Sequence, residues 1–264
     1  MKIVMIAILA VAAAACSQPL EQPKFPSGGL VDLSHDYGAD TVFWPTAESF
    51  TLEKVADGMT PGGYYYAANN FATSEHGGTH IDAPVHFAKG HKSVDQIPID
   101  QLIGDAIVID VTASCASNPD YRVTTADFDA WEKSNGQIPN GAIVLLRTGY
   151  ARFWPDAATY LGTAERGEAA VAKLHFPGLH QDAAKWLIES RRIKAIGLDT
   201  ASIDYGQSTL YESHRTLYEH DIPAFENLAT LDRLPATGAK VIALPMKIKG
   251  GSGAPLRAIA ILPN

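Results

Sequence analysis

The sequence predicts a single α/β domain with a mixed sheet. Short runs rich in β-branched residues, bounded by Gly, Pro or Asp, alternate with amphipathic helical segments along the chain. Additional strand-like runs occur at both ends of this alternation, which favours antiparallel strands beside parallel ones. From Gly29 onward no repeat, low-complexity tract or second linker interrupts the pattern, so we expect residues 29–264 to form one domain.

Individual elements follow from local patterns. The predicted strands are residues 29–35, 64–71, 106–112, 141–149, 193–199, 239–248 and 256–262. The predicted helices are residues 124–136, 180–192 and 208–223, the first ending at Gly136 and the third at Pro223. The stretch "GGSGAPLR" at 250–257 lacks the third glycine of a dinucleotide-binding motif, so it predicts a hairpin joining the last two strands.

The N-terminal segment is predicted to lie outside this domain. Residues 1–15 carry one early Lys2 and then an apolar run of signal-peptide length, which is too short to span a bilayer comfortably. The alanines before Cys16 resemble the lipobox of bacterial lipoproteins, although Ala13 replaces the usual Leu. We therefore expect a lipidated Cys16, a flexible tether at 16–28, and an exported periplasmic protein that touches the membrane only through this anchor. Ordinary signal cleavage is the alternative.

Composition excludes several functions. The formal net charge is −8 with no offsetting basic run, which argues against nucleic acid as a partner. A G-x-S-x-G nucleophile elbow and a P-loop are both absent from the sequence. Cys115 is the only cysteine besides Cys16, so no disulfide is expected, and Cys115 is predicted to be a small buried apolar residue.

The stretch "EHGGTHIDAPVHF" concentrates potential metal ligands. It places His76, His80, Asp82 and His86 within eleven positions, which neither a surface loop nor a core would require. Two imidazoles and a carboxylate suit Zn²⁺, Mn²⁺ or Fe²⁺, and three protein ligands leave positions open for water or substrate. A cluster of structural histidines is the alternative interpretation.

The spacing of these residues excludes a single regular element. His76 and His80 have same-face spacing on a helix, whereas His80 and Asp82 have same-face spacing in an extended segment. Gly77 and Gly78 permit an irregular backbone between the two, and a proline soon afterwards stops a helix. We therefore expect a tight turn entering a short extended piece, with three side chains converging on one point.

The pattern H-x-G-T-H-x-D-A-P-x-H resembles the signature of the cyclase family, which includes bacterial kynurenine formamidases and isatin hydrolases. The resemblance continues through "LLRTGY", "FPGL", "IGLDTASIDYGQS", a His214 and Glu226 pair twelve residues apart, and "VIALPMKI" with "GGSGAPLR". It implies a swivelling β/β/α domain assembled as a homodimer or a dimer of dimers.

The resemblance also implies roles for particular residues. His76, His80 and Asp82 would bind a first metal. In the formamidase branch the positions of His214 and Glu226 bind a second metal, which Asp82 bridges to the first. In the isatin-hydrolase branch, which binds a single manganese, a glutamine replaces Glu226. The carboxylate here favours two metals, with Zn²⁺ expected and Mn²⁺ the alternative.

His86 corresponds to the family's catalytic histidine, which shuttles protons and is not a ligand. A divalent ion lowers the pKa of a water molecule, and a histidine near the ion can protonate the departing nitrogen of an amide. We therefore predict a metal-dependent hydrolase of a small-molecule C–N bond. A non-catalytic, exported metal- or ligand-binding lipoprotein is the alternative of another class, but a pure binding site would not need His86.

Phe43 and Trp44, in "TVFWPTAESF", are predicted to form an aromatic wall for an aryl substrate, or else a packed cluster beside Pro45. N-formylkynurenine, an intermediate of tryptophan catabolism, is the first expected substrate, and an isatin-type lactam is the second. Export argues against the first, because the family implies that tryptophan breakdown is cytoplasmic.

Overall fold

The computed structural model describes residues 25–26 and 28–264. The predicted signal peptide at 1–15, the lipidation site Cys16 and most of the predicted tether at 16–28 lie outside the described residues. Within the described part of the chain, no helix combines the length and the apolar character that crossing a membrane requires.

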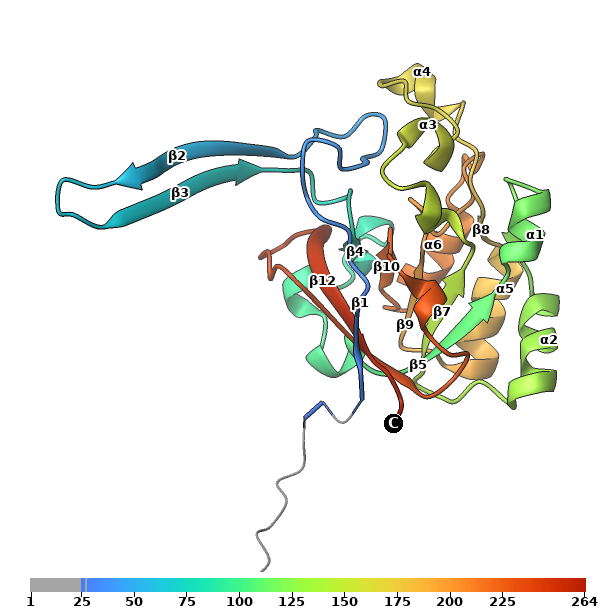
Figure 1. Cartoon of the computed structure of the whole chain (residues 1–264). Helices are drawn as coiled ribbons and strands as arrows, with labels where there is room; N and C mark the ends of the chain where they lie inside the picture. Colours follow the sequence, from blue (N-terminus) through green and yellow to red (C-terminus); the bar gives the residue numbers. More distant parts are fainter. Residues whose placement is uncertain (1–24, 27) are drawn as a thin grey trace, which may run out of the picture.

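A closed barrel of seven strands forms the centre of the domain (Figure 1). Its strands, in spatial order, are β12 (Gly253–Ile261), β11 (Ala239–Pro245), β5 (Ile103–Asp110), β7 (Ile143–Arg147), β9 (Ala195–Leu198), β10 (Ala224–Glu226) and β4 (His80–Asp82). The pairs from β5 to β10 are parallel and the remaining pairs are antiparallel. An eighth strand, β1 (Leu30–Asp32), pairs with β12 outside the barrel. The single α/β domain with a mixed sheet is therefore confirmed.

The expected swivelling β/β/α arrangement is wrong, because the sheet closes on itself. The short strand β4 pairs with β10 on one side and with β12 on the other. These two pairings join the first and last strands of the sheet, so the barrel has no free edge. Small residues pack in the barrel core, among them Ala106, Ala195, Ala243 and Ala258. Side chains of this size allow opposite walls to approach, which a closed barrel of short strands requires.

Two hydrophobic cores share the parallel strands. On β5, Ala106 and Val108 belong to the barrel core, whereas Ile107 and Ile109 pack in the layer that contains the helices. The outer core lies against α2 (Thr125–Asn135), α5 (Gln181–Trp186) and α6 (Glu212–Tyr218). Burial on both faces explains why these strands are continuous apolar runs in the sequence.

Shorter elements connect these layers. They are α1 (Thr112–Ser117), β6 (Arg122–Val123), α3 (Ala157–Tyr160), α4 (Glu168–Val171), β8 (Gly178–Leu179), a π-helical turn at Leu187–Arg191, and 3₁₀ turns at Pro84–His86, Val94–Gln96, Ile99–Gln101, Tyr150–Phe153 and Leu231–Arg233. The helix predicted at 180–192 is α5 continued by the π turn, and the helix predicted at 208–223 is limited to α6. The predicted hairpin loop does join β11 to β12.

A long β-hairpin projects from the barrel (Figure 1). It consists of β2 (Thr51–Met59) and β3 (Tyr65–Ala72), which pair antiparallel, and we call residues 51–72 the β-hairpin arm. The sequence predicts β3 but not β2, because Glu53, Lys54 and Asp57 obscure the alternation that identifies a half-buried strand. The arm has no buried face of its own, which explains the missing signal.

Candidate metal centre

Strands β4 and β10 place three of the predicted ligands on one face. His80 and Asp82 are two residues apart on β4, so their side chains lie on the same side of the strand. In the antiparallel pairing, Glu226 of β10 lies opposite His80. The extended geometry predicted for His80 and Asp82 is therefore present, and the carboxylate 144 residues further along the chain reaches the same face.

The turn before β4 brings in His76. Gly78 has a φ of +57°, and a Cβ there would lie 2.6 Å from the ring of Tyr37. A Cβ on Gly77 would lie 2.0 Å from the ring of Phe43, so the two glycines let the backbone pass beneath these aromatic rings. This turn leaves Nδ1 of His76 2.7 Å from Oδ1 of Asp82. The side chains of His76, His80 and Asp82 therefore converge on one point, as their spacing in the sequence predicts.

Helix α6 supplies His214. Its Nδ1 lies 2.6 Å from Oδ2 of Asp204. The same oxygen accepts a hydrogen bond from the backbone N–H of His214, and Oδ1 accepts one from the backbone N–H of Ser213. With Nδ1 on this carboxylate, Nε2 lies 3.2 Å from Oε1 of Glu226 and 3.5 Å from Oδ2 of Asp82. Burial disfavours the charged ring, but the hydrogen bonds to the surrounding carboxylates raise the pKa of His214 well above its ordinary value, and a bound cation would take the place of the proton on Nε2.

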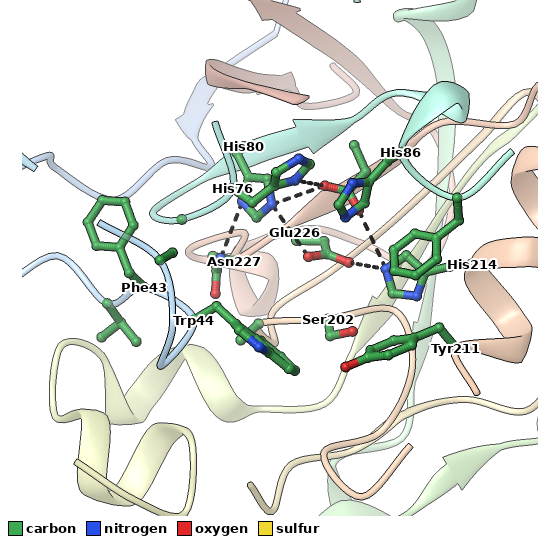
Figure 2. Close-up of a pocket in the computed structure, with 16 residues that line it drawn as sticks. Phe43, Trp44, His76, His80, His86, Ser202, Tyr211, His214, Glu226 and Asn227 are labelled. Carbon is green, nitrogen blue, oxygen red and sulfur yellow. Dashed lines mark hydrogen bonds and ion pairs between the residues drawn. The ribbon is translucent and has the colours of Figure 1, made fainter. Parts of the chain in front are cut away.

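Two ligand groups result, and they share one carboxylate. The first contains His76, His80 and Asp82, and the second contains Asp82, His214 and Glu226. In each group the donor atoms lie within 4.8 Å of one another. Figure 2 shows His80 of β4, Glu226 of β10 and His214 of α6 converging, with His76 beside them from the turn that precedes β4. Two His/Asp/Glu groups are a donor set for divalent cations of the zinc and manganese type.

Two features of the buried side chains fit a cation at this position. Nδ1 of His80 donates to the Gly78 carbonyl at 2.9 Å, whereas its buried Nε2 has no hydrogen-bond partner among the described residues and faces Asp82 and Glu226. Burial and the adjacent charge of Asp82 raise the pKa of Glu226. Burial acts on Asp82 in the same direction, but the surrounding histidines hold its pKa well below the usual value. A cation would give the free lone pair an acceptor and offset the repulsion between the carboxylates.

His86 lies beside the two groups. Its ring stacks on His76 with the centroids 3.9 Å apart, and its Nε2 lies 3.9 Å from Oδ2 of Asp82, which is too long for a hydrogen bond. Burial and the neighbouring histidines together lower the pKa of His86 to about 4 against the attraction of Asp82. A neutral ring at pH 7 can accept a proton and then return it.

A pocket of about 330 Å³ opens directly onto the donor atoms. Phe43 is buried over Gly77 and forms one wall, and Trp44 packs edge-on against Phe176 and forms another (Figure 2). The two aromatic residues predicted to contact substrate therefore line the pocket, although Phe43 is also a packing residue. The full lining is Val42, Phe43, Trp44, Ala47, His76, Gly77, His80, Asp82, His86, Phe87, Ala201, Ser202, Tyr211, His214, Glu226 and Asn227.

Several supporting residues were not predicted. The hydroxyl of Tyr218 donates to Oδ2 of Asp82 at 2.8 Å, and its position four residues after His214 on one helix is a sequence signal that identifies it in retrospect. Asn227 donates to the Gly78 carbonyl at 2.8 Å and directly follows Glu226. Asp204 orients His214 from a loop, and it lies within "IGLDTASIDYGQS", a stretch that shows the family resemblance, although its role was not predicted.

Family membership follows from the similarity of this chain to known proteins. The family model named Cyclase matches residues 31–205. The chain belongs to the Cyclase family. Isatin hydrolase from Roseibium aggregatum is 32% identical over 247 residues, which cover 90% of this chain and 89% of the relative. Kynurenine formamidase from Salinibacter ruber is 26% identical over 239 residues, which cover 87% of this chain and 96% of the relative.

Solved Cyclase-family structures have the same fold. Isatin hydrolase A from Labrenzia aggregata, bound to benzyl benzoate, superposes with a TM-score of 0.80 at 34% identity. The match covers 89% of this chain and 94% of that chain. A structure described as a potential metal-dependent hydrolase with cyclase activity has a TM-score of 0.64 at 21% identity and supports the fold alone. With its two ligand groups, this chain is a metal-dependent hydrolase of the Cyclase family.

Proposed function

We propose that this protein hydrolyses the amide bond of an isatin-type lactam, a cyclic amide fused to an aromatic ring. The observation that carries the proposal is the pocket, in which aromatic walls enclose a space that ends on the histidines and carboxylates. Similarity to isatin hydrolases at 32% identity in sequence and a TM-score of 0.80 in structure supports this substrate class over an open-chain formamide. An isatin-type lactam, the second substrate expected from the sequence, therefore replaces N-formylkynurenine as the first candidate.

The chain's own residues suit a flat aromatic ligand. Trp44 and Tyr211 line the pocket below the donor atoms, and Phe87 contacts Tyr211 and His214 with ring centroids 5.1 Å and 4.7 Å away (Figure 2). Aromatic walls stabilise a planar ring by burial and by stacking. The same walls exclude water from the reacting carbonyl, which strengthens electrostatic interactions there.

The reaction adds water across the C–N bond. A divalent cation held by the two ligand groups would supply a water of lowered pKa and polarise the carbonyl. The new bond joins the water oxygen to the carbonyl carbon, and the C–N bond breaks. We assign the proton transfer to His86, which accepts a proton from the water through its free nitrogen and delivers it to the departing nitrogen. Its stacking on His76 holds it beside the cation site without making it a ligand.

We propose two divalent cations per chain, with Zn²⁺ first and Mn²⁺ as the alternative. Asp82 belongs to both ligand groups, and Glu226 adds a second negative charge. Two cations close together repel strongly unless anionic ligands lie between and beside them, so the pair of carboxylates supports double occupancy.

Arylformamide hydrolysis is the second candidate, because the family resemblance implies a carboxylate at the position of Glu226 in the formamidase branch. The test restores Zn²⁺ or Mn²⁺ to metal-free protein and measures hydrolysis of isatin and of a formyl-arylamine. Faster turnover of isatin per mole of protein supports the proposal, and faster turnover of the formamide replaces it. If the metal-loaded protein hydrolyses no amide, lactam or ester, the hypothesis of a non-catalytic binding protein takes its place.

A homodimer is the proposed assembly, either alone or paired into a tetramer. Seven of the fourteen exposed large apolar side chains in the described residues lie on the β-hairpin arm. An isolated two-stranded hairpin is marginally stable in water, and monomers rarely expose apolar patches of this kind. Leu52, Met59, Tyr65 and Phe71 share one face of the arm, because Leu52 pairs with Phe71 and Met59 with Tyr65. This exposed apolar face supports a second copy as the occupant.

Periplasmic location and lipidation of Cys16 remain predictions from the sequence. Fractionation of cells that express the unmodified protein and Cys16→Ser tests both. A membrane-associated unmodified protein with a soluble variant is expected, and a soluble unmodified protein contradicts the anchor.

A further inference from the structure

The glycine-rich loop between β11 and β12 lies against the first ligand group. A Cβ on Gly253 would lie 2.5 Å from Cε1 of His76, and a Cβ on Gly251 would lie 2.8 Å from Oε1 of Glu75. The absence of side chains at these two positions lets the loop backbone approach both residues closely. The loop therefore does more than connect two strands, which is all that its sequence predicts.

Ser252, between these glycines, links Glu75 to His76. The Ser252 hydroxyl donates to Oε2 of Glu75 at 2.7 Å, and the backbone N–H groups of Ser252 and Gly253 donate to the same oxygen at 3.0 Å and 3.3 Å. Nε2 of His76 lies 3.0 Å from the Ser252 oxygen. A hydroxyl has a single proton, and Glu75 takes it, so the remaining lone pairs of Ser252 accept the Nε2–H of His76.

This chain of hydrogen bonds determines which nitrogen of His76 can bind a cation. When Nε2 carries a proton, Nδ1 is the nitrogen that faces Oδ1 of Asp82, at 2.7 Å. His80 and His214 are held in a comparable way, each with Nδ1 on an acceptor and Nε2 toward the carboxylates. His76 differs from the other two histidines in solvent exposure. Its side chain is 24% exposed, whereas those of His80 and His214 are 2% and 4% exposed.

We propose that Ser252 and Glu75 are positioning residues for the first metal, fixing the tautomer and the ring orientation of His76. Packing restrains His80 and His214, but the more exposed His76 depends on the Ser252 hydroxyl. The proposal rests on the metal centre proposed above. Outer hydrogen-bond partners of metal-binding histidines typically contribute 10- to 100-fold to metal affinity, which sets the size of the expected effect.

The test measures Zn²⁺ affinity directly, by competition with a chromophoric chelator, on metal-free full-length protein. Ser252→Ala and Glu75→Ala, which each remove one member of the hydrogen-bond chain, should weaken the binding of the first Zn²⁺ by about 10- to 100-fold. Ser252→Thr keeps a hydroxyl and should restore affinity to within about threefold of the unmodified protein. Thermal unfolding of the metal-free variants should stay unchanged, which separates positioning from a loss of fold.

Asp95→Ala is the matched control, because it removes the oxygen that holds the far end of the loop. Oδ1 of Asp95 accepts a hydrogen bond from the Gly250 backbone N–H at 2.9 Å and so holds the same loop, but from the end away from His76. Its Zn²⁺ affinity should match that of the unmodified protein. Equal weakening by Asp95→Ala and Ser252→Ala would assign the effect to loop order and overturn the inference, as would unchanged affinity in Ser252→Ala. Failure of the unmodified protein to bind Zn²⁺ would instead overturn the metal centre itself.

Discussion

His80 and Glu226 lie opposite each other across the antiparallel pairing of β4 and β10, with Nε2 of His80 3.5 Å from a carboxylate oxygen of Glu226. Asp82 lies between the two ligand groups, with one oxygen toward His80 and the other toward His214. The strand that closes the barrel is therefore also the strand that carries the carboxylate shared by both ligand groups. Barrel closure and assembly of the metal centre depend on the same three residues of β4, His80–Asp82.

Asp82→Asn should remove tight binding of both cations, because the amide keeps the shape of the side chain but not the charge that both ligand groups share. Elemental analysis after dialysis against zinc is the measurement. Tyr218→Phe is the control, because it removes only the hydrogen bond to Oδ2 of Asp82 and should retain metal. Full occupancy in Asp82→Asn would show that Asp82 does not bridge the groups.

Glu226→Gln should reduce the protein from two metals per chain to one. The neutral amide cannot offset the charge of a second divalent cation, whereas His76, His80 and Asp82 still form the first group. Activity should change and not vanish, if one metal suffices for hydrolysis. Zinc titration by calorimetry or native mass spectrometry decides the outcome, and a stoichiometry of one in the unmodified protein would require the two-metal proposal to be withdrawn.

His86→Ala should lower kcat by roughly 10² to 10⁴ while metal content stays unchanged, because it removes a positioned proton carrier and no ligand. Single-turnover kinetics and elemental analysis of the same preparation measure both quantities. Phe87→Leu is a suitable comparison, since it alters the neighbouring wall of the pocket but removes no titratable group. Loss of metal from His86→Ala would make His86 a ligand and leave the proton transfer unassigned.

The sequence predicted the parts of the site that are local. His76, His80, Asp82 and His86 fall in one short stretch, and spacing alone indicates a turn followed by an extended segment. His214 and Glu226 were found by family resemblance, because the contact of Glu226 with β4 spans more than 140 residues. No pattern of alternation specifies such a pairing.

Barrel closure was not predictable for the same reason. A three-residue strand such as β4 carries too few residues to show any periodicity, and its pairing with β12 joins opposite ends of the domain. Ser252 illustrates a second limit, since a serine between glycines is typical of a loop. Only the folded structure places its hydroxyl beside His76.

Leu52→Ser combined with Met59→Ser should reduce the mass of the assembly measured by light scattering, if the β-hairpin arm contacts a second copy. Leu52 and Met59 lie opposite Phe71 and Tyr65 in the hairpin register, and all four side chains are exposed. Replacing two of them removes apolar area that the interface would bury. Glu53→Ser combined with Asn70→Ser, an opposing polar pair of the same hairpin, should leave the mass unchanged. An unchanged mass for both double variants would exclude the arm.

His35 should make folding stability depend on pH. Its ring stacks on Trp154 at 4.2 Å, its buried Nε2 has no hydrogen-bond partner among the described residues, and burial lowers its pKa to about 4 against the attraction of Asp36 and Asp32. Between pH 6.5 and pH 4 the unfolded chain therefore binds a proton that the folded protein does not, so the free energy of unfolding falls as the pH falls. His35→Phe keeps the stacking but cannot titrate, and from pH 7 to pH 4.5 it should gain about 2 kcal/mol relative to the unmodified protein. Urea denaturation of both proteins without metal at each pH measures this difference, and a constant difference would show that folding does not lower the pKa of His35.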